Sequence, residues 1–108
     1  MFRFSDPVEV LAAPLSEGAY ASTRDWARSS VVWSGLGHVQ PDGSVEAQSP
    51  ARETAQERML IYLPVGVPVS STDRIRYHGG VFEVDGEPMR WPHGGLRHVR
   101  IRVWRAMH

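Results

Sequence analysis

The sequence contains no cysteine and no lysine, and these absences limit the sites that it can build. Without thiols the chain can form neither a disulfide framework nor a zinc site with thiolate ligands. It also lacks a run of about 20 apolar residues, which a membrane-spanning helix needs, and the basic and apolar regions of a signal peptide. The formal net charge is zero, so no strong positive field draws nucleic acid to the whole molecule. All twelve cationic side chains are arginine, whose planar guanidinium group suits bidentate contacts at interfaces.

Enzyme chemistry has little support in the sequence. Five histidines invite a metal hypothesis, but the closest pair, His93 and His98, has neither the spacing of a helical zinc motif nor an acidic residue between its members. No Gly-x-Ser-x-Gly nucleophile elbow is present, and the paired glycines lack the lysine or helix of a phosphate-binding loop. We therefore expect a protein that is not an enzyme, with no catalytic residue, no metal ion and no cofactor.

The clearest secondary-structure pattern lies in residues 73–105. In its last part Val99, Ile101 and Val103 alternate with polar residues, which is the period of a half-buried strand. The glycine pair at 79–80 is typical of a two-residue hairpin turn, and Asp85 with Gly86 forms a second turn signal. The pattern predicts a meander of three or four short strands whose apolar face must be covered by the rest of the chain.

Three further segments have the composition of strands, namely residues 7–14, 29–40 and 58–64. Prolines at positions 7 and 14 predict an edge position for the first, because proline cannot donate a backbone hydrogen bond. Gly35 and Gly37 predict a bulge or a sharp bend in the second. The third is continuously apolar and predicts a central strand covered on both faces.

Two segments lack this composition. Residues 15–28 are polar and predict an irregular loop or one weak helical turn. Residues 41–57 contain no aromatic or large aliphatic side chain, and acidic residues outnumber Arg52, so we expect a long mobile loop. The whole pattern predicts an all-β fold with little helix: one domain over residues 1–108, an SH3-like or sandwich-like barrel.

The last predicted strand carries the densest group of charged and aromatic side chains, formed by Arg97, His98, Arg100, Arg102 and Trp104. Three interpretations stay open. The group can be a solvated strand face that prevents aggregation, a contact with another protein, or a nucleic-acid surface in which aromatic rings alternate with cations.

The sequence resembles the head-closure, or head-to-tail stopper, family of tailed siphophages. The pattern runs through Ile61-Tyr62-Leu63-Pro64, Gly66, Asp73-Arg74-Ile75, Gly80, Phe82, Val84, Gly86, Pro88 and Trp91-Pro92, and upstream through Arg24-Asp25-Trp26 and Val39-Gln40-Pro41. Neighbouring adaptor and tail-completion proteins of the same neck share this pattern in part. A small nucleic-acid-binding barrel is the alternative from another class.

The resemblance implies a virion protein, made in the host cytoplasm, that closes the DNA-filled head as a ring of six or twelve copies. Its expected partners are a portal or adaptor ring, a tail terminator or tail tube protein, and the packaged DNA passing through without sequence-specific binding. No membrane is involved. Residues 97–104 become the candidate ring or tail interface, and the loop 41–57 becomes a candidate channel stopper, with lumen residues Asp42, Glu46, Gln48, Arg52 and Glu53.

Overall fold

The computed structural model describes residues 3–17, 22–42, 55–94 and 97–107 of the chain. This part of the molecule is almost entirely β-structure, and it contains one short 3-10 helix, η1 (Trp26–Arg28). The strands are β1 (Asp6–Ala12), β2 (Leu15–Glu17), β3 (Ser22–Arg24), β4 (Ser30–Pro41), β5 (Ala55–Leu63), β6 (Arg74–Tyr77), β7 (Gly80–Val84), β8 (Met89–Trp91) and β9 (His98–Met107). The described residues include no helix long and apolar enough to cross a membrane.

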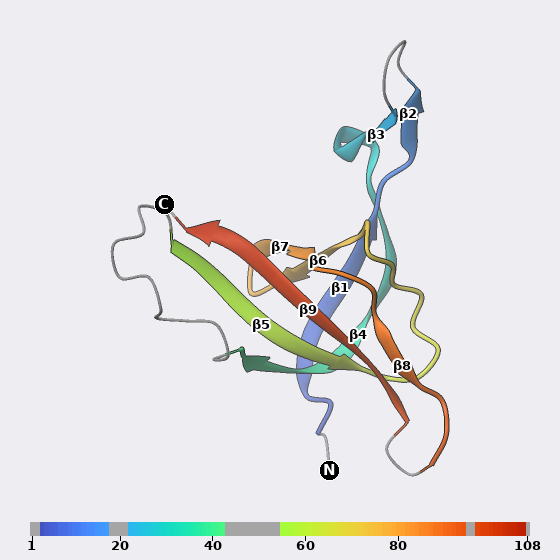
Figure 1. Cartoon of the computed structure of the whole chain (residues 1–108), viewed down its shortest axis with the longest axis vertical. Helices are drawn as coiled ribbons and strands as arrows, with labels where there is room; N and C mark the ends of the chain where they lie inside the picture. Colours follow the sequence, from blue (N-terminus) through green and yellow to red (C-terminus); the bar gives the residue numbers. More distant parts are fainter. Residues whose placement is uncertain (1–2, 18–21, 43–54, 95–96, 108) are drawn as a thin grey trace.

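Six antiparallel strands close into a barrel (Figure 1). They follow one another in the order β4, β1, β6, β7, β9 and β5, and β5 closes the ring because it pairs with both β9 and β4. The short β8 pairs with the same side of β9 as β7 does, beyond the end of β7. The predicted fold class, a small all-β barrel with little helix, is confirmed.

The barrel interior is filled by alternating side chains of these strands. In β9, Val99, Ile101 and Val103 are buried, as their period-two spacing predicts. They meet inward side chains of β5, including the fully buried Ile61 and Leu63, across a ladder that runs from Ala55↔Met107 to Leu63↔Val99. This ladder is the longest in the barrel and has no register shift, so β5 and β9 share the most cross-strand side-chain contacts.

The prediction that residues 58–64 form a strand covered on both faces was wrong. Met59, Ile61 and Leu63 are buried, whereas Leu60 and Tyr62 are only half-buried. One face of β5 therefore looks into the barrel and the other looks outward, as expected for a closed sheet with no second layer outside it.

The edge position predicted for the first strand was also wrong, because β1 lies between β4 and β6. Pro7 is tolerated since β6 pairs only with residues 9–11, so Pro7 has a neighbour only in β4.

The bulge predicted at Gly35 or Gly37 lies elsewhere. Between β1 and β4 the register shifts where Val10 faces Trp33 and Leu11 faces Val31, which leaves Val32 as the extra residue. Gly37 serves a different purpose: a Cβ atom there would lie 2.9 Å from Leu63 Cδ2 and 2.9 Å from the carbonyl oxygen of Tyr62. At this position β4 stops pairing with β1 and starts pairing with β5, so the missing side chain lets two strands meet closely.

The hairpin between β6 and β7 turns one residue earlier than the glycine pair predicts. His78 and Gly79 both have positive φ, 52° and 78°, as a type I′ turn requires. Gly80 instead opens β7, where a Cβ atom would lie 2.2 Å from a guanidinium nitrogen of Arg105. The second turn signal was right in position, because Gly86 has a φ of 83° and β7 ends at Val84.

The two segments predicted without strands also need correction. Residues 15–28 contain one helical turn, η1, as one of the two predictions for this segment had it, but the β2–β3 hairpin before η1 was not predicted. Of the predicted loop 41–57, Pro41 still belongs to β4 and residues 55–57 already belong to β5. In β5 the polar Gln56 and Glu57 come before the apolar run that was predicted to be the strand. Residues 43–54, the rest of the predicted mobile loop, lie outside the described residues.

Candidate functional site

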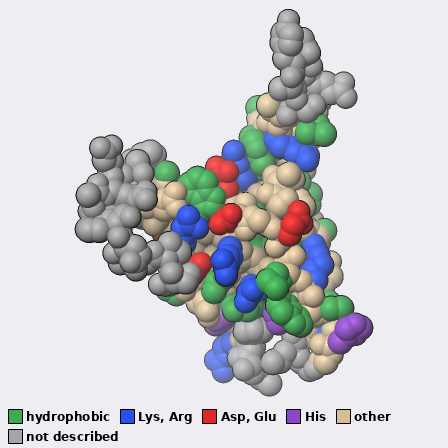
Figure 2. Space-filling view, viewed as in Figure 1, with side chains coloured by type: hydrophobic (Ala, Val, Ile, Leu, Met, Phe, Trp, Pro, Cys, Tyr) green, Lys and Arg blue, Asp and Glu red, His purple; other side chains and the backbone are tan. Residues whose placement is uncertain are grey.

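The outward side of β9 carries most of the predicted interface. Because Val99, Ile101 and Val103 point into the barrel, His98, Arg100, Arg102 and Trp104 share the opposite face. Arg97 precedes the strand and is exposed. The structure thus brings the predicted group together along one strand, and Figure 2 shows arginine side chains beside hydrophobic ones on the face that β9 crosses.

Aromatic rings from neighbouring strands continue this face across the sheet. Trp91 of β8 stacks on His98 with ring centroids 4.9 Å apart and an interplanar angle of 20°. His98 lies 5.5 Å from Tyr62 of β5, and Tyr62 lies 5.9 Å from His38 of β4. His98 is only 9% exposed, so a histidine on an outward position is buried under its neighbours. We call the set Trp91, His98, Tyr62, Arg100 and Arg102 the cationic face.

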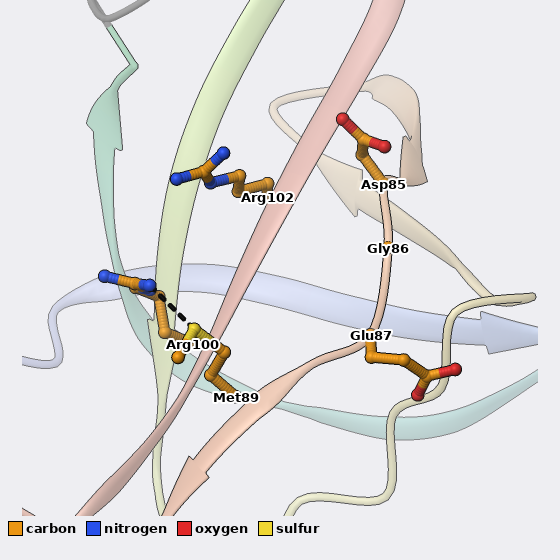
Figure 3. Close-up of a pocket in the computed structure, with 6 residues that line it drawn as sticks. All are labelled: Asp85, Gly86, Glu87, Met89, Arg100 and Arg102. Atoms are coloured by element: carbon orange, nitrogen blue, oxygen red, sulfur yellow. Dashed lines mark hydrogen bonds between the residues drawn. The ribbon is translucent and has the colours of Figure 1, made fainter.

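The two central arginines of this face point the same way. In Figure 3 the guanidinium groups of Arg100 and Arg102 lie on one side of β9, and the carboxylates of Asp85 and Glu87 lie on the other. Arg100 Nη2 lies 2.7 Å from the sulfur of Met89, and its guanidinium carbon lies 5.6 Å from the centre of the Trp91 ring. A hollow beside the two arginines is open and small, about 200 Å³; it is lined by Asp85, Gly86, Glu87, Met89, Arg100 and Arg102. It is smaller than a typical pocket for a small-molecule ligand.

Three arginines outside this face, Arg58, Arg76 and Arg105, are each paired with an acid. Arg58 lies 3.4 Å from Asp85, and Arg105 lies 2.8 Å from Glu57. Arg76 pairs with Glu9. Among the residues that the structure describes, no carboxylate lies within 4.0 Å of the guanidinium nitrogens of Arg97, Arg100 or Arg102. The cationic face therefore presents positive charge that this part of the chain does not neutralise.

Trp104 lies at the far end of the same strand face from Trp91. It is half-buried and pairs in register with Arg58 of β5 and Glu83 of β7. The next residue, Arg105, instead packs over the ring of Phe82, 4.7 Å from its centre. Trp104 thus continues the face of Arg102 toward the end of β9, beside Arg58 of β5.

A second surface lies on β4 and has the opposite character. Residues 30–37 pair with β1 on one side, and no described residue gives their other side a strand pairing or a backbone hydrogen bond. This segment has no charged residue, and Val31, Val32 and Leu36 are 45%, 43% and 49% exposed. We call it the β4 edge. An apolar edge strand without charge or proline is a template for pairing with another chain.

The β2–β3 hairpin extends the same ribbon beyond the barrel (Figure 1). Its base is held by hydrogen bonds from the Asp25 amide to the Pro14 carbonyl oxygen, 2.9 Å, and from Arg24 Nη1 to the Ala13 carbonyl oxygen, 3.1 Å. The guanidinium of Arg74 lies 4.0 Å from the centre of the Trp26 ring and ties η1 to β6. We call this hairpin the arm. Two strands of three residues are marginal on their own, so the arm depends on these contacts.

Of the predicted lumen residues, only Asp42 lies in the described part of the chain. Its backbone amide donates to the carbonyl oxygen of Arg58, 3.1 Å away, which places Asp42 at the start of the segment between β4 and β5. Glu46, Gln48, Arg52 and Glu53 lie outside the described residues.

The described residues contain no group of three or more His, Asp or Glu side chains that could hold a metal ion. The clearest change in acidity concerns Tyr77, where burial, and to a smaller extent the nearby Asp6 carboxylate, raises the pKa above its usual 10.0. Tyr77 packs against the core and lies away from the cationic face, so this change bears on stability.

Sequence reasoning found the cations of β9 but missed Trp91, Tyr62 and His38. These three come from strands far apart in the chain, and only the register of β8, β9, β5 and β4 brings them together. It missed the β4 edge because Val31, Val32 and Leu36 have the composition of a buried strand. To find this edge, one must know which strands pair with β4, and the sequence alone does not give the order of strands in the sheet.

Comparison with known proteins identifies the fold. No family model matches the sequence, and no curated protein matches it. Among solved structures, the solution structure of protein SF1141 from Shigella flexneri 2a matches with a TM-score of 0.59. The match covers 94% of this chain and 91% of that one, at 18% sequence identity. At this identity the likeness shows a shared barrel fold, and it carries no function from one protein to the other.

Proposed function

We propose that this chain is a structural subunit of the neck of a tailed phage, a ring that closes the DNA-filled head and gives the tail its docking surface. The sequence resemblance to head-closure proteins supports this function. The barrel adds physical support, because the cationic face and an exposed apolar strand are surfaces suited to contacts with other chains. The hollow beside Arg100 and Arg102 is small and open, about 200 Å³.

The observation that carries the proposal is the β4 edge. Val31, Val32 and Leu36 expose apolar surface along a strand whose second side has no described partner. Proteins that work as monomers protect such edges with charge, proline or a covering segment. A ring covers them by a head-to-tail contact that repeats from copy to copy and closes by rotation. The β4 edge, extended by the arm, is the surface for that contact.

The cationic face serves a second kind of contact, to the portal or adaptor ring above or to the tail protein below. It is polar, and Arg and Trp are enriched in such contacts. A neutral net charge agrees with a ring that lets DNA pass without holding it.

Deletion of the gene for this chain from the genome that encodes it tests the proposal. A neck ring is needed to join heads and tails, so the expected result is separate heads and tails in electron micrographs, with DNA lost from the heads. Re-supply of the wild-type chain should restore joined particles. Particles that assemble and stay infectious without the chain would contradict the proposal.

One observation favours a second candidate, a barrel that binds nucleic acid. The cationic face combines Arg100 and Arg102 with the exposed Trp91, and single-stranded nucleic acid binds to surfaces of this composition. Its affinity for DNA would fall steeply with salt concentration, because each phosphate contact releases counterions. A gel-shift titration at two salt concentrations separates this candidate from the neck subunit, for which no such binding is expected.

An adaptor or a tail-completion protein of the same neck is a further alternative. Electron micrographs of the particle would then place this chain in a different layer of the neck.

A further inference from the structure

We propose that the cationic face binds an extended, acidic segment of another protein, with Arg100 and Arg102 facing its carboxylates. The inference rests on the proposed function in one respect, because it takes the partner to be another protein of the phage neck. It adds the chemistry of the segment by which that partner would dock.

Charge is the first reason. Arg100 and Arg102 have no carboxylate within 4.0 Å among the described residues, whereas Arg58, Arg76 and Arg105 each have one. The guanidinium groups of Arg100 and Arg102 also lie away from Asp85 and Glu87, the acids of the same hollow (Figure 3). A guanidinium group binds a carboxylate through two parallel hydrogen bonds, so two such groups side by side select a partner with two acids.

Spacing is the second reason. Arg100 and Arg102 are two residues apart on one face of β9, so their Cα atoms are about 6.6 to 6.8 Å apart. An extended polypeptide places alternate side chains at the same interval. A segment with acidic residues at positions i and i+2 can therefore face both arginines at once, whereas a helix places such residues on different sides.

The surroundings of the two arginines are the third reason. Met89 and Trp91 of β8 are 45% and 41% exposed and flank them on one side, and Leu60 and Tyr62 of β5 are half-buried on the other. A partner that covers these side chains removes water from the ion pairs and strengthens them. The expected segment thus has apolar residues next to its acids.

The face is also held in place before a partner arrives. β9 is paired with β5 along its length, and β8 is anchored because Arg90 donates to the carbonyl oxygens of Val67 and Val69 at 3.1 and 2.6 Å. A surface that is already ordered loses little conformational entropy on binding.

Nucleic acid fits the same face less well. Domains that bind nucleic acid are usually strongly basic, whereas this chain has a net charge of zero and a pI of about 7.0. The Trp91 ring, the most exposed aromatic side chain of the face, is already stacked on His98 and lies beside Arg100. The observations therefore favour a protein segment, and nucleic acid becomes an outcome of the test.

A titration followed by nuclear magnetic resonance tests the inference on the full chain. The probes are a short synthetic peptide that alternates glutamate with valine, the same peptide with glutamine for glutamate, and an oligothymidylate. The variants are Arg100→Gln with Arg102→Gln, and a control, Arg3→Gln with Arg28→Gln, which removes the same charge from exposed positions outside this face.

The glutamate peptide should shift the indole signal of Trp91 and the amide signals of β9, and it should bind about fivefold more tightly than the glutamine peptide. The Arg100 and Arg102 double variant should lose that preference, and the control should keep it. Equal affinity for the two peptides, shifts outside the face, or tighter binding of the oligothymidylate would overturn the inference. None of these results depends on particle assembly, so the proposed neck function can stand or fall separately through removal of the chain.

Discussion

The pair β5–β9 and the pair β1–β4 are built from similar residues but present different surfaces. The β5–β9 ladder is unbroken, and its outward positions carry arginine, histidine and aromatic side chains. The β1–β4 ladder is interrupted at Val32, and along residues 30–37 its outer strand exposes apolar side chains and no charge. Other strands pair with part of each outer edge of the first pair, at residues 59–62 of β5 and at residues 98–100 and 103–104 of β9. Residues 30–37 of β4, in contrast, have no second strand partner among the residues that the structure describes.

Under the proposed function, this difference assigns the two surfaces to two kinds of partner. Where both edges of a strand are paired, only side chains remain for contacts, and charge then decides which partner fits. Where an edge is free, backbone groups and apolar side chains can be shared with another strand, which suits a contact repeated between copies. One domain can therefore hold a neighbour of its own kind on one surface and a different protein on another.

The largest expected difference between the two regions concerns the loss of an apolar side chain. Ile101→Ala, in the fully paired region, should lower the free energy of unfolding by about 3 kcal/mol, because Ile101 is 2% exposed and its removal leaves a cavity. Val32→Ala, at the β4 edge, should cost less than about 0.5 kcal/mol. Urea denaturation measures both values. Similar losses at the two positions would mean that the β4 edge is covered within the subunit.

Gly37 joins the two regions, and adding a methyl group there should have the next largest effect. Gly37→Ala should lower the free energy of unfolding by about 2 kcal/mol, because the new Cβ atom meets the Leu63 side chain and the Tyr62 carbonyl oxygen. Ser34→Ala, on the same strand at an exposed position, is the control and should be nearly neutral. If Gly37→Ala were also neutral, the close approach of β4 and β5 would be contradicted.

A charge on the β4 edge should weaken association between copies. Val32→Lys should reduce self-association about tenfold, or about 1.4 kcal/mol, since a lysine ammonium group opposes apolar strand pairing. Val65→Lys, at a similarly exposed valine in the turn after β5, is the matched control and should have no effect. Sedimentation equilibrium at high protein concentration measures the change. If the wild-type chain stayed monomeric and sedimented like the Val32→Lys variant, the β4 edge would not be a contact between copies.

The ion pair between Arg105 and Glu57, at the end of the β5–β9 ladder, should matter less. Arg105→Gln removes the ion pair with Glu57 and the contact with the Phe82 ring, and it should cost about 1 kcal/mol. Asp85→Asn removes only the exposed contact with Arg58 and should cost less than about 0.5 kcal/mol. Thermal unfolding at low and high salt measures the loss of stability in each variant. Equal losses in Arg105→Gln and Asp85→Asn would show that the contact with the Phe82 ring does not stabilise the barrel.

The smallest predicted effect concerns pH. Because the pKa of Tyr77 is raised in the folded barrel, the unfolded chain ionises first, and stability should fall as the pH rises above 10.0 toward the folded value. Below pH 10.0 this contribution is fully present. Tyr77→Phe should make the loss of stability less steep between about pH 9 and about pH 11. Denaturation midpoints across this range measure it, and identical slopes for both chains would contradict the pKa change.

The sequence predicted the barrel because its inward positions follow simple alternation. Val99, Ile101 and Val103 are the clearest case, and Gly86 with Pro88 marked the break between β7 and β8. Strand ends were less predictable, since polar residues such as those at the start of β5 are held by their partner β9 and not by their own propensity. The turn at His78 was missed because a positive φ is uncommon in residues other than glycine, and the adjacent glycine pair was the stronger turn signal.

The candidate site could be predicted only along one strand. Arg100 and Arg102 are close in sequence, so their shared face followed from the period of β9. Trp91 and Tyr62 join them through pairing between distant strands, and both rings pack against His98, which is buried. No local pattern contains this information, because register between strands is a property of the closed barrel.

Electron cryomicroscopy of the assembled particle tests most directly whether the two surfaces hold two kinds of neighbour. The expected image is a ring of this chain between head and tail, with the β4 edge against the next copy and Arg100 and Arg102 against a different protein. A particle without this chain in its neck, or a ring in which the β4 edge and the cationic face are both bare, would contradict the division of surfaces argued above.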